Sequence, residues 1–372
     1  MIYDLQDGEK QAFETDVCIV GSGAAGLSMV REFFDTNVRV LVLESGGGNR
    51  EGLSDSLNEG INVGVPNGSL VNGRCRVLGG TTDIWPGACI PLTEADISTR
   101  HWVPFSGWPI GMDVLRPYYA RAAEFFSVRI ADFQQDVWSL LNVAGPEFDP
   151  AMLDHAINLF SPRTHRYPGK RLRRQLEQSN NVHVLLHATA SELITSPDGA
   201  RVVEVEVRAP TARRGKISAR VVVVAAGGFE NARLLLLSRR FEPGGIGNRH
   251  DQVGRYFQDH PTGQVATIHT ERPQILQRPY GVSFQGFPPR PRPYPKIRLS
   301  PALQQREHVL NCSANVVWDI DLESAEQGIL QVFRTLRGLR LPLLPPREMA
   351  KILRDLPGTC QRPPAIDPLS PV

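Results

Sequence analysis

The chain has 372 residues, which is long enough for two domains or for one large discontinuous domain. Its formal net charge of +2 provides no overall field that would attract nucleic acid or a membrane surface. The five cysteines are scattered without metal-ligand spacing, so we predict neither a metal site nor a disulfide framework. No secretory signal and no apolar run of membrane-spanning length is visible, so we expect a cytoplasmic protein.

The first predicted elements are a strand, a glycine-rich turn and a helix. The apolar run at 16–20 is typical of a buried parallel strand, and the sequence GSGAAG follows it directly. In such a turn the first glycine permits the tight bend, the second lets the backbone approach a pyrophosphate, and the third lets the helix pack on the strand. The helix start offers free N–H groups to the phosphate. This pattern predicts a dinucleotide site formed by Gly21, Ser22, Gly23, Ala24, Ala25 and Gly26.

A carboxylate follows the second predicted strand, which covers residues 38–43. Glu44 lies about 20 residues beyond the glycines, where an acidic side chain binds a ribose hydroxyl and disfavours a 2′-phosphate. The strand, the helix and the carboxylate together favour dinucleotide binding over a glycine turn with a purely structural role. They do not by themselves decide between FAD and NAD.

The remaining predicted elements follow in chain order. Residues 47–90 are rich in Gly and Asn and indicate a loop, and apolar spacing predicts a helix over 115–125. From about residue 181 the pattern indicates strands at 182–186, a hairpin of 191–195 with 201–208, and a strand at 219–224 that leads into a helix over 230–238. We also predict a strand within 309–320 and an amphipathic helix over 324–340, whose apolar stripe we interpret as core packing.

The long interruption of the predicted sheet favours FAD over NAD. A simple NAD-binding domain would continue with strand–helix–strand units directly after Glu44. Here the sheet resumes only past residue 180, which fits a cofactor whose flavin extends away from the first unit. The small residues 225–228, at the end of another apolar strand, can bring bare backbone close to the cofactor again, and they can serve close helix–sheet packing at the same time.

With these residues in view, the chain resembles the glucose–methanol–choline (GMC) oxidoreductases, flavoenzymes that oxidise alcohols and sugars. The resemblance runs from about residue 14 to 265 and is weaker to about 360. Four segments carry it: GSGAAG with Glu44, RVLGGTTDIWPGACIPL from Arg76, SGWPIGMDVLRPYYARA from Ser106, and VVVVAAGGFENARLLLLS together with VGRYFQDHP, from Val221 and Val253.

The resemblance implies a set of cofactor-binding residues. The glycine turn would surround the pyrophosphate of FAD, and Glu44 with the adjacent Ser45 would lie at the adenosine ribose. A second segment would run along the pyrophosphate and flavin, and its last residues would lie near the ring. Residues from about 188 to 190 would pass the adenine. Beyond the glycine turn, Glu44 and Ser45, the set is Arg76, Gly79, Gly80, Thr81, Asp83, Ile84, Trp85, Ala188, Ala226, Gly227 and Asn231.

The resemblance also bears on how the flavin is held. Some GMC relatives bind it covalently through a histidine in the segment that matches residues 80–85. This chain has Ile84 where that histidine is expected. We therefore expect non-covalent FAD.

The expected fold is α/β. We predict a Rossmann-like FAD-binding domain with a parallel sheet, formed discontinuously by residues 1–100 and 180–265. Residues 101–179 would form a helical insertion or cap. Residues 266–372 would form part of an α+β substrate domain that is incomplete. The expected reaction is oxidation of the CH–OH group of a sugar, polyol or other alcohol, with hydride transfer to flavin N5.

No catalytic base is identified. In the GMC family a histidine, paired with a second histidine or an asparagine, removes the hydroxyl proton, and it lies in a C-terminal portion that no stretch of this chain resembles. We interpret His260 as structural and expect His101, His165, His250 and His308 on exposed loops. Three explanations stay open: a fragment or frameshifted product, one half of a split enzyme whose partner chain supplies the base, or a flavin-binding remnant without turnover. An NAD-linked dehydrogenase is a further alternative.

Overall fold

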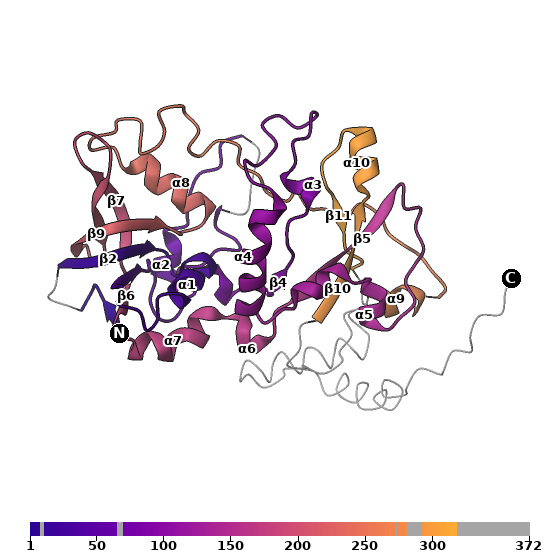
Figure 1. Ribbon diagram of the computed structural model, residues 1–372, viewed down its shortest axis with the longest axis horizontal. Coiled ribbons are helices and arrows are strands. Elements are labelled where there is room, and N and C mark those ends of the chain that lie inside the picture. Colours follow the sequence, from indigo (N-terminus) through magenta and orange to yellow (C-terminus); the bar gives the residue numbers. More distant parts are fainter. Residues whose placement is uncertain (8–10, 65–69, 273, 281–291, 318–372) are drawn as a thin grey trace, which may run out of the picture. The chain divides into compact units, whose positions relative to one another are not determined.

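The computed structural model describes residues 1–7, 11–64, 70–272, 274–280 and 292–317. The chain divides into two units, Met1–Ala314 and Asn315–Val372. The predicted helix over 324–340 therefore lies outside the described residues. Within the first unit the chain forms two sheets (Figure 1).

The larger sheet has seven strands in the order β1-β6-β3-β2-β9-β8-β7. Their bounds are β1 Ile2–Asp4, β2 Ala12–Val20, β3 Val40–Leu43, β6 Val182–Leu186, β7 Thr189–Thr195, β8 Val202–Arg208 and β9 Arg214–Val224. The first five strands of that order pair in parallel, and β9, β8 and β7 pair antiparallel. The predicted α/β fold with a parallel sheet is thus confirmed.

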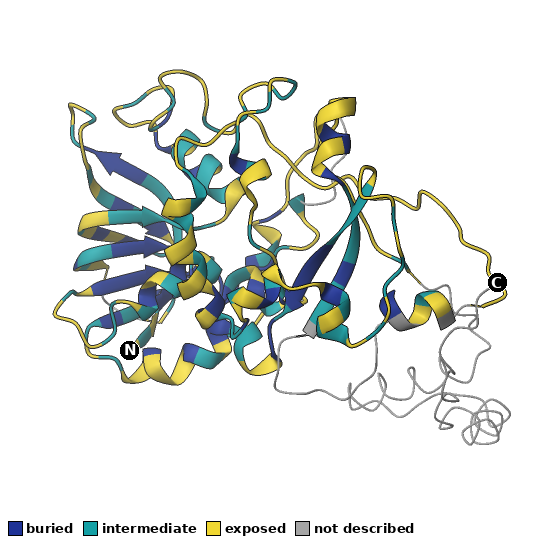
Figure 2. Ribbon diagram, turned by 45° about the vertical axis from the view of Figure 1, so that its right-hand side comes forward, coloured by how far each residue is buried: buried dark blue, intermediate teal, exposed yellow. Residues whose placement is uncertain are grey.

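Side-chain alternation gives this sheet two apolar faces, because neighbouring residues of a strand point to opposite sides. On one face Ile19 and Val42 pack against Leu27 of helix α1 (Ala24–Arg31) and Leu176 of helix α7 (Pro168–Gln178). The residues that alternate with them, including Cys18 and Leu41, pack on the other face with β7, β8 and helix α8 (Gly228–Leu237). Figure 2 shows the buried residues concentrated on the strands.

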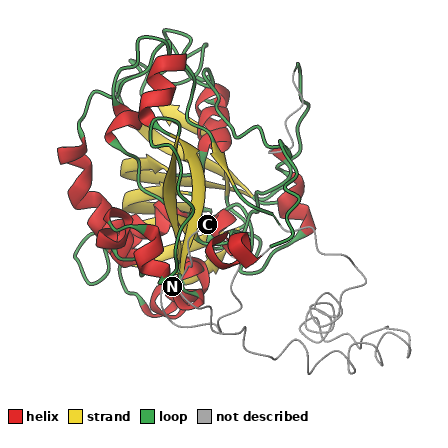
Figure 3. Cartoon of the chain, turned by 90° about the vertical axis from the view of Figure 1, so that its right-hand side faces the viewer, coloured by secondary structure: helices red, strands yellow, loops and turns green. Residues whose placement is uncertain are grey.

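The smaller sheet has the order β11-β10-β5-β4 and is antiparallel throughout. It consists of β4 Ala88–Cys89, β5 Leu153–Phe160, β10 Arg292–Leu299 and β11 Ser313–Ala314. A third apolar cluster lies against it and includes Leu159 and Val137. Figure 3 shows the strands with helices packed around them.

The other helices are short, except for one of fourteen residues. They are α2 Gly52–Ser56, α3 Glu94–Ile97, α4 Met112–Phe125, α5 Val137–Leu141, α6 Arg163–Arg166, α9 Gln274–Tyr280 and α10 Pro301–Glu307, with 3₁₀ turns η2 Gly80–Asp83 and η3 Ile130–Gln134.

Most predicted elements lie where the sequence places them, with some differences. The strand predicted at 38–43 begins at Val40, and the helix predicted at 230–238 is α8. The segment 101–179, predicted as a helical insertion, also contains β5, whose partner β10 lies more than a hundred residues away. Of the strand predicted within 309–320, the described part contains only Ser313–Ala314. The predicted division into three domains stays a prediction.

Candidate functional site

A cavity of about 670 Å³ opens at the carboxyl ends of β2, β3 and β9. Ligands of open α/β sheets bind beyond these ends. Its walls come from separate parts of the chain: the glycine turn with α1, the end of β3, residues 57–58, the segment 74–82, the start of β7, and the end of β9 with helix α8. The predicted residues among its lining are Gly21, Ser22, Gly23, Ala24, Ala25, Glu44, Ser45, Arg76, Gly80, Thr81, Ala188, Ala226, Gly227 and Asn231.

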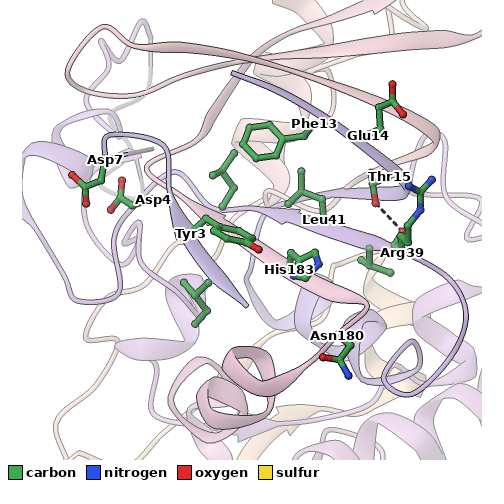
Figure 4. A pocket seen from close by; sticks show the side chains of 13 residues that line it. Tyr3, Asp4, Asp7, Phe13, Glu14, Thr15, Arg39, Leu41, Asn180 and His183 are labelled. Atoms are coloured by element: carbon green, nitrogen blue, oxygen red, sulfur yellow. Dashed lines mark hydrogen bonds between the residues drawn. The ribbon is translucent and has the colours of Figure 1, made fainter. Parts of the chain in front are cut away.

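A second cavity, of about 690 Å³, lies at the opposite ends of β2 and β3, beside β1 and β6 (Figure 4). Tyr3, Phe13, Leu41 and His183 line it, and the figure shows their side chains on the face of the sheet near the strand starts. It contains neither a glycine turn nor a helix N-terminus. The cavity at the carboxyl ends is therefore the better candidate, although the two have similar volumes.

The three glycines of the turn have different surroundings. A Cβ on Gly21, whose φ is +105°, would lie 2.5 Å from the carbonyl oxygen of Ala225, so only glycine fits between β2 and β9. A Cβ on Gly26 would lie 2.0 Å from the carbonyl oxygen of Gly21, which keeps α1 close to the strand end. A Cβ on Gly23 would meet nothing within 4 Å. Gly23 thus exposes its backbone to the cavity.

Helix α1 begins at this opening. Its N-cap, Gly23, makes no side-chain hydrogen bond to the first turn, and the first intrahelical bond runs from the N–H of Leu27 to the carbonyl of Gly23 at 2.9 Å. The N–H groups before Leu27 are thus left for a ligand, and the helix dipole makes this end positive. The arrangement suits an anionic group such as a pyrophosphate.

The second predicted segment meets the glycine turn directly. Gly80 has a φ of +55°, and a Cβ there would lie 2.9 Å from the Cα of Gly23. The backbone N–H of Gly79 donates to Ser22 Oγ at 3.1 Å. Two motifs almost sixty residues apart in the sequence therefore form one wall, and on the Gly80 side their contact leaves no room for a Cβ.

Glu44 is buried at the end of β3, with 5% of its surface exposed. One carboxylate oxygen accepts hydrogen bonds from the N–H of Ser22 at 3.2 Å and from Ser22 Oγ, and the other accepts from the N–H of Gly46 at 2.9 Å. Burial raises the pKa of Glu44, and these hydrogen bonds partly oppose that effect. Each oxygen can accept more than one hydrogen bond, so Glu44 can hold the glycine turn and still accept a hydroxyl from a ligand.

Arginines gather around Glu230 on another wall. Arg74 and Arg76 pair with Glu230 Oε1 at 3.0 and 2.9 Å, and the more exposed Arg233 lies 3.6 Å from Oε2. Burial alone would raise the pKa of Glu230, but the guanidinium groups lower it. One carboxylate thus faces three guanidinium groups, and the excess of positive charge suits an anionic ligand.

Hydrogen bonds also fix two further parts of the cavity. Arg76 donates to Ser45 Oγ at 3.0 Å, and Ser45 Oγ lies 2.6 Å from Thr189 Oγ1, which joins the end of β3 to the start of β7 beside Ala188. On the far wall the N–H of Ala226 donates to Asn231 Oδ1 at 2.8 Å.

That bond holds the turn after β9. Gly227 there has a φ of +90°, and a Cβ on it would meet nothing within 4 Å. Gly227 therefore exposes bare backbone next to the turn that Asn231 fixes.

Five predicted residues do not line this cavity. Gly26 and Gly79 lie behind it, at close backbone contacts. Asp83 pairs with Lys170 at 2.5 Å, and Ile84 is 39% exposed. Trp85 donates to the carbonyl of Arg166 at 2.7 Å and packs edge-on against Phe126. The structure therefore does not bring Asp83, Ile84 and Trp85 to the cavity wall.

Several lining residues were not singled out from the sequence. They are Arg74, Glu230, Arg233 and Asn58, whose side-chain oxygen accepts from Arg76 at 2.9 Å. The signal for Arg74 was its position two residues before Arg76, which reaches the same carboxylate. Arg76 and Arg74, two of the partners of Glu230, lie 154 and 156 positions earlier in the chain, and no local pattern indicates them.

The described lining of the cavity contains no histidine. The side chain of His260 is 96% exposed beside Asp259. His165 was expected on an exposed loop, but it lies in α6 and is half-buried, because α6 packs against α7. In the described ranges no three or more His, Cys, Asp or Glu side chains could together hold a metal ion, and no helix could cross a membrane.

Comparisons with known proteins complete this description. The GMC oxidoreductase family model matches residues 168–262, from α7 through β9 and α8, which confirms the predicted resemblance in this segment. Formate oxidase, a solved structure, is 18% identical, with a TM-score of 0.41 over 62% of this chain and 48% of that chain. A variant of formate oxidase from Aspergillus oryzae RIB40, made to examine FAD modification, is also 18% identical, with a TM-score of 0.40 over 62% of this chain and 48% of that chain. Pyridoxine 4-oxidase from Mesorbium loti is 19% identical, with a TM-score of 0.40 over 60% of this chain and 52% of that chain. The chain spans about half the length of these structures. No curated protein matches.

Proposed function

Since residues 168–262 match the GMC oxidoreductases, whose members use FAD, we propose that this chain binds FAD in the cavity at the carboxyl ends of β2, β3 and β9. The reaction that it serves is oxidation of the CH–OH group of a sugar, polyol or other alcohol. When bound, FAD supplies the hydride acceptor at flavin N5.

One observation carries this proposal: three glycine-containing turns meet at the uncapped start of α1. Gly23 and Gly227 have open space where a Cβ would be, and Gly80 contacts the backbone of Gly23. A dinucleotide needs such bare backbone around its pyrophosphate. The guanidinium groups around Glu230 add positive charge to the same cavity.

The proposed roles follow from position. The turn from Gly21 to Ala25 and the segment of Gly80 and Thr81 hold the pyrophosphate. Glu44 accepts a hydrogen bond from the adenosine ribose, and Ala188 lies along the adenine. Ala226, Gly227 and Asn231 line the cofactor from the β9 side. Arg76 has its donors on Asn58, Ser45 and Glu230, so it fixes the walls and contributes charge.

We also propose that the flavin is bound non-covalently. Ile84 offers no nucleophile, and it does not line the cavity. Acid precipitation of the loaded protein should therefore release all of the flavin into the supernatant. Yellow colour retained in the washed precipitate would contradict this.

The proton of the alcohol needs a base that the described lining lacks. We propose that a partner polypeptide supplies a histidine for this step, because the pKa of an imidazole lies near neutrality. A second candidate function rests on the same observation: the chain acts as a flavin-binding subunit without turnover of its own. Turnover of an alcohol by the isolated, FAD-loaded chain would exclude this second candidate.

The test of cofactor binding uses Gly23→Val, with Gly244→Val as the matched control. Both glycines have open space at the Cβ position, but only Gly23 lines the cavity, whereas Gly244 lies on an exposed loop. We expect flavin fluorescence titrations to show FAD binding by the wild type and by the control. Binding by Gly23→Val should be lost without a change in far-UV circular dichroism. A wild-type chain that binds NAD and not FAD, or equal FAD binding by both variants, would overturn the proposal.

A further inference from the structure

Two imidazoles meet on the surface, away from the cofactor cavity. His101 follows α3, and His308 is the C-cap of α10, 207 positions later in the chain. Their Nε2 atoms are 3.2 Å apart, and the rings are perpendicular with centroids 4.9 Å apart. Both residues are exposed, so solvent ions can reach them.

Trp102 holds both rings in place. Its indole stacks on His308 with a centroid distance of 5.6 Å and an interplanar angle of 14°, and it contacts His101 edge-on at 4.9 Å. The indole N–H donates to the carbonyl of Val309 at 3.2 Å. The two imidazoles are thus oriented before any ligand arrives, which lowers the entropic cost of binding.

The separation of the two nitrogens suits a shared metal ion. Histidine nitrogens lie about 2.0–2.1 Å from zinc, so two of them on one tetrahedral ion are roughly 3.3 Å apart. The observed Nε2 separation of 3.2 Å agrees with that value. Two rings whose nitrogens pointed straight at each other at this distance would have centroids farther apart than 4.9 Å. The two nitrogens therefore do not point straight at each other, which leaves room for both to face a third atom.

We propose that His101 and His308 chelate a divalent transition-metal cation of the class that prefers imidazole, represented by Zn²⁺, through their two Nε2 atoms. No third His, Cys, Asp or Glu joins this pair in the described residues, so water completes the coordination and the ion is exchangeable. The ion would join the segment between α3 and α4 to the turn between α10 and β11. The proposal does not depend on the proposed cofactor function.

Metal binding tests the proposal directly. The full chain, freed of metal by a chelator, is titrated with Zn²⁺ in a calorimeter and compared with His101→Gln, His308→Gln, the double variant and His250→Gln, an exposed histidine outside the pair. We expect one site per chain, unchanged in His250→Gln and weakened more than about tenfold in each single variant. The double variant should bind Zn²⁺ about as weakly as either single variant, because the loss of one ring already prevents chelation.

A second measurement does not depend on how many weak Zn²⁺ sites the chain has elsewhere. Zn²⁺ should raise the melting temperature of the wild type and of His250→Gln, because it binds only the folded state, and it should not do so for His101→Gln. The proposal is overturned if the wild type has no stoichiometric Zn²⁺ site. It is also overturned if His101→Gln and His308→Gln bind Zn²⁺ as tightly as the wild type.

Discussion

His187 illustrates how much a single buried side chain can connect. Its Nδ1 lies 2.7 Å from Asp4 Oδ2, and its Nε2 lies 3.0 Å from Glu51 Oε2. Only 8% of its side chain is exposed. Burial lowers the pKa of His187, but the hydrogen bonds to Glu51 and Asp4 outweigh burial and raise it above 6.5. When protonated, the imidazole donates to both carboxylates and so joins β1 to the residue before α2, beside the loop that carries Glu44.

This arrangement predicts a pH-dependent stability. The pKa of His187 is higher in the folded chain than in the unfolded chain, where it is about 6.5. The contribution of His187 to stability is therefore complete at pH values below the unfolded pKa, and it is lost as the pH rises through the folded pKa. His187→Gln should lower the free energy of unfolding by about 2 kcal/mol near pH 6, and by less at alkaline pH. Urea denaturation across this range measures the difference.

The control for this prediction is His250→Gln, which lies on an exposed loop and should leave the pH profile unchanged. A constant difference between wild type and His187→Gln at every pH would show that His187 contributes packing alone. Titration of the His187 imidazole by NMR would report the raised pKa directly.

At the scale of elements, the junction of β2, α1 and β9 depends on glycine for two separate reasons. Gly26 and Gly21 allow backbones to touch, whereas Gly23 leaves space open toward the cavity. The three glycines of one short motif therefore carry different roles: two belong to the packing of the fold, and one belongs to the proposed cofactor site.

Gly26→Ala should destabilise the fold by about 1–3 kcal/mol, the usual cost of overpacking. Its Cβ would lie 2.0 Å from the carbonyl of Gly21, so α1 must move away from β2. In urea the unfolding midpoint should fall with an unchanged m-value. The matched variant Gly23→Ala should cost less than about 1 kcal/mol, because it only changes an N-cap. Equal losses in both variants would contradict the separation of roles.

For the whole molecule, the unpaired edge of β9 is the main structural consequence of the sheet order. β9 pairs with β2 along its length, but β8 pairs only with residues 214–217. In the part of the chain that the structure describes, no strand pairs with the other side of residues 219–224. Val221, in this stretch, is 53% exposed. An apolar, unpaired edge of this kind is a site for strand addition.

We therefore expect the chain to self-associate, or to bind a partner, through this edge. Sedimentation velocity of the isolated chain should show growing species as its concentration rises, and Val221→Lys should shift them toward monomer, because a charged side chain opposes strand addition. Val114→Lys, at an exposed valine of helix α4, which is on no strand edge, is the control and should have little effect. A monodisperse wild-type monomer at all concentrations would contradict this expectation.

The residues that were predictable share a local cause. The turn from Gly21 to Gly26, strand β2 and helix α8 could be predicted because glycine spacing and apolar periodicity act over a few residues. The small β5–β10 pairing escaped prediction because each strand is recognisable only beside its distant partner. Similarly, Asp83, Ile84 and Trp85 follow a predicted binding motif, but the path of the chain at the end of η2 and beyond it takes them away from the cavity wall.

The sequence by itself determined the parallel sheet, the glycine turn and the position of Glu44 at the end of β3. These features depend on short-range sterics and on the two periodicities of strands and helices. Only the tertiary structure decided that Glu230 faces Arg74 and Arg76, that His187 lies between Asp4 and Glu51, and that His101 meets His308. In each case the partners lie more than a hundred residues apart, so their attraction acts only after the sheets and helices have packed and excluded water.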